Sequence, residues 1–125
     1  MSGANGIPWP EMVPLIERYG VYWVSLDPVQ GSEIAKTRPA VVISDDTMNR
    51  FLDTVVVCPL TSRLHHQWPS RIQTTIAGSP AEIAIDQIRT IDKARIGTRL
   101  DSLDPSAATQ VRHVITRMYG VLAVE

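Results

Sequence analysis

A glycine-led segment at residues 31–39, GSEIAKTRP, carries the side chains best suited to chemistry in this chain. It places the carboxylate of Glu33 five residues before the guanidinium of Arg38, and an apolar run at residues 40–43 follows directly. An arginine at the root of a buried strand offers a fixed, planar fork for two phosphate oxygens, and the loop before it can fold over a bound anion. The segment therefore predicts an anion site. The alternative is a simple exposed ion pair between Glu33 and Arg38, which stabilises a protein by about 0–1 kcal/mol.

Two hydroxyl residues, Thr61 and Ser62, follow another apolar run. Hydroxyl donors beside a fixed arginine can hold a phosphate whose negative charge grows in a transition state. Cleaving RNA without a metal ion needs such a cradle, a base that removes the proton of the ribose 2′-hydroxyl, and a protonated leaving oxygen. Glu33 and Asp86 are the candidate bases. Thr61 and Ser62 are alternatively turn residues that bond their own backbone, and Asp86 a strand-end residue that bonds loop amides.

Length and composition exclude several classes of protein. With 125 residues, of which 44% are hydrophobic, the chain can close one core without a metal ion or a disulfide. No apolar run approaches the roughly 20 residues that a membrane span needs, and the N-terminus lacks the pattern of a secretory signal. The single cysteine, Cys58, reads as a buried strand residue. We expect one cytoplasmic domain that needs no cofactor.

The net charge of −1 argues against a general nucleic-acid coat protein, yet basic residues concentrate at residues 63–71 and 89–99. Two local basic surfaces suit a grip on a short single strand of RNA, and equally on an acidic peptide. The candidate RNA contacts are Ser62, Arg63, His65, Trp68, Gln87 and Arg89. Adjacent histidines, His65 and His66, lack the convergent spacing of a zinc site, so we predict no metal site and interpret both as solvated loop residues.

Strand and helix signals predict a mainly β fold of the α+β class. Apolar or alternating runs at residues 21–26, 40–43, 54–58, 71–76 and 82–86 predict strands, with a turn at residues 78–80 between the last two. Trp23 is expected in the core, and Ile83 and Ile85 are expected to point inward with Asp86 on the other face. A helix is predicted to begin after Asp104 and to end at Gly120. Five or more strands with one packed helix indicate a compact, strongly curved sheet.

Six fragments, in this order and at this spacing, resemble the MazF/PemK family of toxin endoribonucleases. They are YWVSLDP at residues 22–28, GSE at 31–33, KTRP at 36–39, PLTS at 59–62, WP at 68–69 and DQIRTIDKAR at 86–95. The resemblance runs from about residue 18 to about residue 103, which makes residues 1–17 an N-terminal appendage and residues 18–125 the toxin domain. It implies an SH3-like small barrel of curved antiparallel sheet with a C-terminal helix, and a homodimer.

The resemblance also implies a function. Such a protein is a metal-independent, sequence-selective endoribonuclease of a type II toxin–antitoxin system. It cuts single-stranded RNA by attack of the 2′-hydroxyl, which leaves 2′,3′-cyclic phosphate and 5′-hydroxyl ends, and a cognate antitoxin inhibits it. We do not expect it to associate with a membrane.

The family positions also imply roles for single residues. Arg38 and Thr61 fall on positions tied to catalysis, Glu33 on the loop acid of the MazF branch, and Asp86 on the base of the PemK/Kid branch. The chain departs from that second branch, since Ala84 stands where its proposed catalytic arginine would be and Ser32 where it has a histidine. The departure favours Glu33 as the base.

Two other function classes fit a barrel of this kind. A gyrase poison of the CcdB type shares the fold, but such proteins depend on a C-terminal Trp-Gly-Ile, and this sequence ends in Val124-Glu125. A non-catalytic barrel that binds a peptide or RNA is the third class, and Ala84 and the near-neutral charge are its only support.

Overall fold

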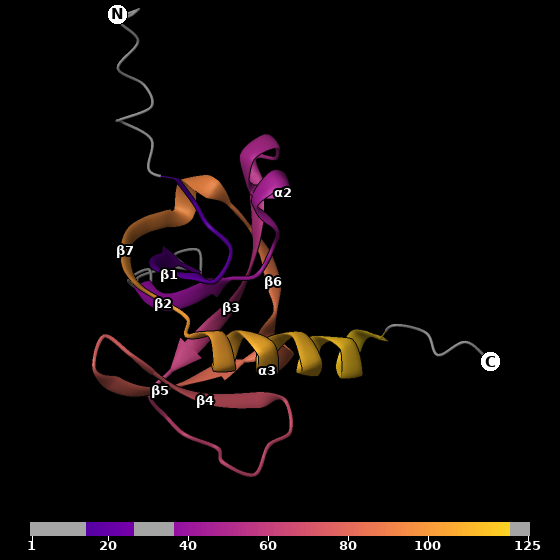
Figure 1. Cartoon of the computed structure of the whole chain (residues 1–125). Helices are drawn as coiled ribbons and strands as arrows, with labels where there is room; N and C mark the ends of the chain where they lie inside the picture. The colour runs from indigo at the N-terminus through magenta and orange to yellow at the C-terminus, as the bar shows by residue number, and fades with distance from the viewer. Residues whose placement is uncertain (1–14, 27–36, 121–125) are drawn as a thin grey trace, which may run out of the picture.

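The computed structural model describes residues 15–26 and 37–120, in which one antiparallel sheet of seven strands curls on itself (Figure 1). The strand order is β4-β5-β3-β2-β1-β7, and β6 pairs with β3. The strands are β1 Gly20–Ser25, β2 Thr37–Val42, β3 Thr54–Thr61, β4 Arg71–Ile76, β5 Ser79–Ala84, β6 Arg89–Asp92 and β7 Ile96–Ser102. The mainly β class, the curved antiparallel sheet and the C-terminal helix are all confirmed.

Helix α3, Pro105–Ile115, lies between the barrel and the β4–β5 hairpin (Figure 1). As predicted, Asp104 caps it: the carboxylate accepts a hydrogen bond of 2.8 Å from the amide of Ala107, and Pro105 occupies the first helical position. A wider helical turn, η3 Thr116–Gly120, continues it to the predicted end. No helix among the described residues is long and apolar enough to cross a membrane.

Strand β3 is the centre of the sheet because it pairs with three other strands. One edge pairs with β2, and the other pairs with β6 near its start and with β5 at its end. Leu60 is the third residue after Val57 on β3, whereas Arg89, the partner of Val57, is the sixth residue after Ile83, the partner of Leu60. The short helix η1, Ile85–Gln87, takes up the difference of three residues and pushes Asp86 out of the sheet.

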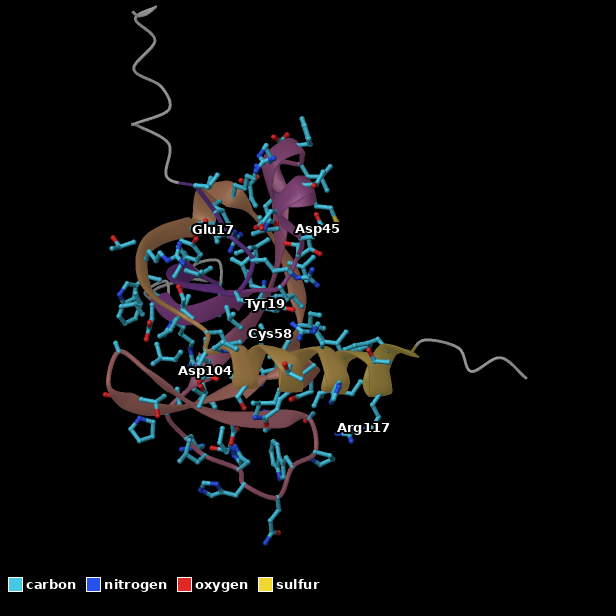
Figure 2. The ribbon with its side chains drawn as sticks, in the orientation of Figure 1. Glu17, Tyr19, Asp45, Cys58, Asp104 and Arg117 are labelled. Carbon is cyan, nitrogen blue, oxygen red and sulfur yellow. The ribbon has the colours of Figure 1, made fainter. Side chains whose placement is uncertain are left out.

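Successive side chains of the central strands enter two different cores. Val21, Val41 and Cys58 belong to a cluster with α3 and the β4–β5 hairpin, and Figure 2 shows Cys58 between the barrel and the helix. Their neighbours Tyr22 and Val42 belong to a second cluster inside the barrel. The central parts of β1, β2 and β3 are therefore buried on both faces, which explains their apolar runs.

The strands predicted in the first half of the chain are present, with small shifts of their ends. The turn of the β4–β5 hairpin lies at Ala77 and Gly78, whose φ angles of 50° and 83° are those of a two-residue hairpin, so the predicted turn was too late by about a residue. Ile83 and Ile85 are buried and Asp86 is exposed, as predicted, but the strand predicted at residues 82–86 is shifted. β5 spans Ser79–Ala84, and Ile85 and Asp86 belong to η1.

The prediction that Trp23 belongs to the core is wrong. It is 39% exposed, because the face of β1 that α3 covers at Val21 is open at Trp23. The sequence interpretation also missed β6, β7, the helix α2 at Asp46–Phe51 and the turn η2 at Lys93–Arg95.

Candidate functional site

A cleft of about 530 Å³ lies between the barrel and the tip of the β4–β5 hairpin. Three of the predicted site residues, Arg38, Thr61 and Ser62, line it together. The rest of its lining is mostly apolar and comprises Trp23, Pro39, Leu60, Ile76, Ala77, Ser79, Pro80, Ala81 and Leu100. The structure thus brings one guanidinium and two hydroxyls to a hollow with apolar walls.

Strand register places each of these polar groups. Arg38 is the second residue of β2 and pairs with Val24 of β1, so the sheet fixes its backbone while its side chain is exposed. Thr61 is the last residue of β3, and its hydroxyl oxygen accepts a hydrogen bond of 3.1 Å from the amide of Arg63. This is the turn role that the sequence left open for Thr61, and the hydroxyl hydrogen remains available as a donor.

The hairpin tip that forms one wall is tied to the barrel. The carboxylate of Asp101, on β7, accepts a hydrogen bond of 2.8 Å from the amide of Ala77 at the turn. Hydrogen bonds from the amides of Ala77 and Ser102 hold the pKa of the Asp101 carboxyl below its usual value. The cleft is therefore closed at this end by a charge-assisted hydrogen bond between the hairpin and β7.

A buried carboxylate, Glu82 on β5, lies beside the cleft and was missed by the sequence interpretation. It is 0% exposed and accepts hydrogen bonds from the Nη1 atom of Arg71 at 2.6 Å and from the Nε2 atom of Gln73 at 2.7 Å. The backbone amide of His65 also donates to it, and the ring Nδ1 of His65 lies 3.0 Å from its other oxygen. Burial alone would raise the pKa of Glu82, but these hydrogen bonds outweigh it and lower the pKa to about 2.

Arg71 links Glu82 to Asp86. Its Nε and Nη2 atoms donate to the two oxygens of Asp86 at 2.8 and 3.3 Å, while Nη1 binds Glu82, and the Arg71 side chain is only 5% exposed. The hydrogen bond from Arg71 lowers the pKa of the Asp86 carboxyl. Asp86 is thus held in a two-pronged ion pair, and it does not line the cleft that contains Arg38 and Thr61.

Two aromatic rings of the loop at residues 62–70 cover this ion pair. The rings of His65 and Trp68 stack with their centres 4.0 Å apart, and the guanidinium of Arg71 lies 4.7 Å from the centre of the Trp68 ring. Trp68 is still 48% exposed. We call Glu82, Arg71, Asp86, His65 and Trp68 the Glu82 network.

The interpretation of His65 as a solvated histidine is therefore wrong, because Glu82 holds both its amide and its ring. The two predicted basic surfaces are also weaker than their sequences suggest. Arg71 is neutralised by two carboxylates, Arg99 pairs with Glu17, and Arg95 donates to the carbonyl oxygens at the end of β1.

The remaining predicted residues lie in three places. Glu33 lies outside the described residues, as does most of the predicted appendage, although Ile16 packs against the barrel core. Arg63 is exposed just after Ser62. Gln87 and Arg89 are exposed on η1 and β6, beyond Asp86, and do not line the cleft.

Two other kinds of chemistry find no support in the described residues. Burial, with a smaller effect from the charge of Asp86, raises the pKa of the Cys58 thiol to about 12, so Cys58 is a packing residue rather than a nucleophile. Over residues 15–26 and 37–120, no group of three or more His, Cys, Asp or Glu side chains is placed to hold a metal ion.

The Glu82 network predicts how stability changes with pH. Because folding lowers the pKa of Glu82 from 4.5 to about 2, the stability that its charge supplies is complete above pH about 4.5 and is lost as the pH falls towards 2. Glu82→Gln should be less stable than the wild type at pH 7, and this difference should narrow as the pH falls. Urea unfolding of both proteins at a series of pH values measures it, and a difference that stays constant between pH 5 and 2.5 would contradict the assignment.

Comparison with known proteins identifies the family of the chain. The model of the family described as PemK-like, MazF-like toxin of type II toxin-antitoxin system matches residues 17–119. The Endoribonuclease MazF of Staphylococcus saprophyticus is 32% identical over 112 residues, which cover 86% of this chain and 93% of that protein.

Solved structures share the fold. MazF of Deinococcus radiodurans superposes with a TM-score of 0.73 at 22% identity over 87% of this chain and all of that one. The MazE–MazF complex from the same organism gives 0.77 at 22% identity, covering 88% of this chain and all of that one. A mycobacterial endoribonuclease in complex with its cognate antitoxin gives 0.70 at 19% identity, covering 90% and 100%. The resemblance inferred from the sequence is confirmed: the chain belongs to the PemK-like, MazF-like toxins of type II toxin–antitoxin systems.

Proposed function

We propose that this protein is a metal-independent endoribonuclease that cuts single-stranded RNA at selected sequences. One observation carries the proposal: Arg38, Thr61 and Ser62, which come from β2, from the end of β3 and from the residue after it, line a single cleft. The naming of the Staphylococcus saprophyticus relative as an endoribonuclease supports the same activity.

The three polar side chains match the needs of phosphate cleavage by the ribose. As the 2′-hydroxyl attacks phosphorus, negative charge builds on the phosphoryl oxygens, and the planar guanidinium of Arg38 can meet it with two parallel donors. The hydroxyls of Thr61 and Ser62, which line the same cleft, add two further donors. Arg38 also serves as the acid that protonates the leaving 5′-oxygen. The products are a 2′,3′-cyclic phosphate and a 5′-hydroxyl.

The apolar walls of the cleft suit the bases and sugars of a single strand. Trp23, half-exposed in the cleft wall, offers a flat face, and stacking of a base on such a ring contributes about 1–3 kcal/mol. Trp68 offers a second exposed ring on the loop at residues 62–70. The RNA continues over the remaining predicted contacts, which are Arg63, His65, Gln87 and Arg89.

Glu33 is our choice for the general base, because the structure gives Asp86 another task. Both oxygens of Asp86 accept hydrogen bonds from Arg71, and its lowered pKa makes it a weak base. Arg71, which lies opposite Ala84 on the neighbouring strand, is the arginine that binds Asp86. Because its guanidinium forms ion pairs with both Glu82 and Asp86, it is not available to bind a phosphate. Asp86 acts by holding Arg71.

The protein's partners follow from its membership of a toxin–antitoxin family. We propose that it forms a homodimer and that a cognate antitoxin blocks its RNA site. The fold is shared with a MazF solved in complex with MazE and with an endoribonuclease solved with its antitoxin, which supports a protein inhibitor here. An acidic segment of the antitoxin would compete with RNA phosphates for Arg38, so the affinity should fall with rising salt.

Arg38→Ala should abolish RNA cleavage without unfolding the protein, because an exposed guanidinium at the start of β2 contributes to phosphate binding and not to the core. Thr61→Ala should lower kcat by about 10²–10³-fold, the usual loss for one preorganised donor. Both are measured with purified protein on single-stranded RNA, after circular dichroism has shown that the variants are folded.

The matched control is Arg50→Ala, which removes an exposed arginine from α2, away from the cleft lining, and should cleave at the wild-type rate. Excess EDTA should leave cleavage unchanged. Near-normal turnover by Arg38→Ala would overturn the mechanism, and loss of activity in EDTA with recovery in Mg²⁺ or Zn²⁺ would overturn its metal independence.

A comparison of Glu33→Gln with Asp86→Asn distinguishes the roles of the two carboxylates. The general base sets the acidic limb of the pH–rate profile, so Glu33→Gln should lose most of its turnover and that limb. Asp86→Asn should keep the limb and instead lose stability, because it loosens the hold on a buried guanidinium. If Asp86→Asn removed the acidic limb and Glu33→Gln kept it, the assignment would have to be reversed.

A further inference from the structure

The side chains of Glu82 and of the cleft residue Thr61 project to the same face of the sheet. Thr61 of β3 pairs with Glu82 of β5, and Glu82 pairs with Gln73 of β4. Residues directly opposite each other in antiparallel strands project to the same side, with Cβ atoms about 4.5–5.5 Å apart. The cleft residue Thr61 and the buried carboxylate are therefore immediate neighbours.

The loop at residues 62–70 begins in the cleft and crosses this face. It leaves β3 after Thr61, and three residues after Ser62 its backbone is held by Glu82 through the amide of His65. It then makes a turn, in which the amide of Trp68 bonds the carbonyl of His65 at 3.0 Å, and it joins β4 at Arg71. Glu82 thus binds the backbone in the middle of the loop, and Arg71 contacts the side chains of His65 and Trp68.

We propose that Glu82 and Arg71 are positioning residues that fix the loop at residues 62–70 in one conformation, and that this fixed loop selects the RNA sequence to be cut. The inference rests on the proposed endoribonuclease activity. Neither residue needs to touch RNA, because Glu82 is fully buried and the Arg71 side chain is almost so. They act through His65 and Trp68, which they hold in a stack at the surface.

A fixed loop favours selectivity for a physical reason. Donors and rings that are already in place lose little conformational freedom when RNA binds, and a wrong base leaves them unpaired. Without the contacts from Glu82 and Arg71, the loop would become ordered only when RNA binds, and it could then adapt to a wrong base. Arg38 and Thr61 lie on strands, so the chemical step should be affected much less than binding.

Glu82→Gln is the direct test. The carboxamide turns an N–H group toward the donors of His65 and Arg71, while Asp86 still holds Arg71. We expect KM for an oligonucleotide carrying the mapped wild-type site to rise about tenfold or more, with kcat within about threefold. The preference for that site over single-base variants of it should fall by about tenfold.

A second variant guards against simple misfolding. A buried ion pair can often be replaced by apolar residues of similar volume without loss of stability. Glu82→Met combined with Arg71→Met should therefore fold, and it should show the same rise in KM and the same loss of selectivity. The stability control is Asp45→Ala, which removes the cap of α2 and is expected to change neither quantity.

Amide hydrogen exchange at His65 measures, without RNA, how firmly Glu82 holds the backbone of the loop. We expect this exchange to be at least about tenfold faster in both variants than in the wild type. If the wild type itself does not cut RNA, the proposed function fails. If the wild type cuts and both variants keep its KM, its site preference and its His65 protection, only the present inference fails. A loss of kcat with unchanged KM and selectivity would also overturn it, since Glu82 and Arg71 would then serve the chemical step.

Discussion

Burial of the Glu82 carboxylate is the constraint on which the site region depends. An ionised carboxylate removed from water costs several kcal/mol unless nearly all of its hydrogen-bonding capacity is met. Here the amide and ring of His65, the guanidinium of Arg71 and the carboxamide of Gln73 meet it. These donors come from a loop and from a neighbouring strand, so the loop must fold onto the hairpin for the charge to be tolerated.

The cleft, by contrast, follows from the pairing of the sheet. Strand β3 is long enough to pair with β6 at its start and with β5 at its end, and its last residue, Thr61, lies at the edge of the barrel. The β4–β5 hairpin extends from this point and turns its tip towards β7, to which Asp101 binds it (Figure 1). Arg38 enters from β2 on the other side of β3. The groups proposed for catalysis, Arg38 and Thr61, therefore lie on strands. The groups proposed to select the RNA sequence lie on a loop that the Glu82 network holds in place.

Much of the fold and the centre of the site could be predicted from the sequence. Strands that contribute to both cores, such as β1 and β3, are unbroken apolar runs, and Asp104 followed by Pro105 indicates the start of α3. The strands β6 and β7 were missed because most of their residues are polar or charged and only one face is covered. The convergence of Arg38, Thr61 and Ser62 was predicted because they follow or begin apolar runs within a recognisable order of motifs.

The Glu82 network could not be predicted, because its residues come together only through the pairing of β4 with β5. Glu82 lies in the middle of an apolar segment and Arg71 lies eleven residues before it, so neither spacing nor composition pairs them. The arrangement of the strands also exposes Trp23 and brings Arg71 of β4 next to Asp86. Pairing across strands depends on where a turn falls, and the turn was placed incorrectly from the sequence.

The central claim is that the ribose of the RNA, assisted by Arg38 and Thr61, is the nucleophile. The most direct measurement is the chemistry of the fragment ends after purified wild-type protein has cut a single-stranded RNA. The account predicts 5′-hydroxyl ends, which a polynucleotide kinase labels without prior phosphatase, and upstream ends that carry a 2′,3′-cyclic phosphate. Fragments with 5′-phosphate ends would contradict it, because water would then have attacked the phosphorus.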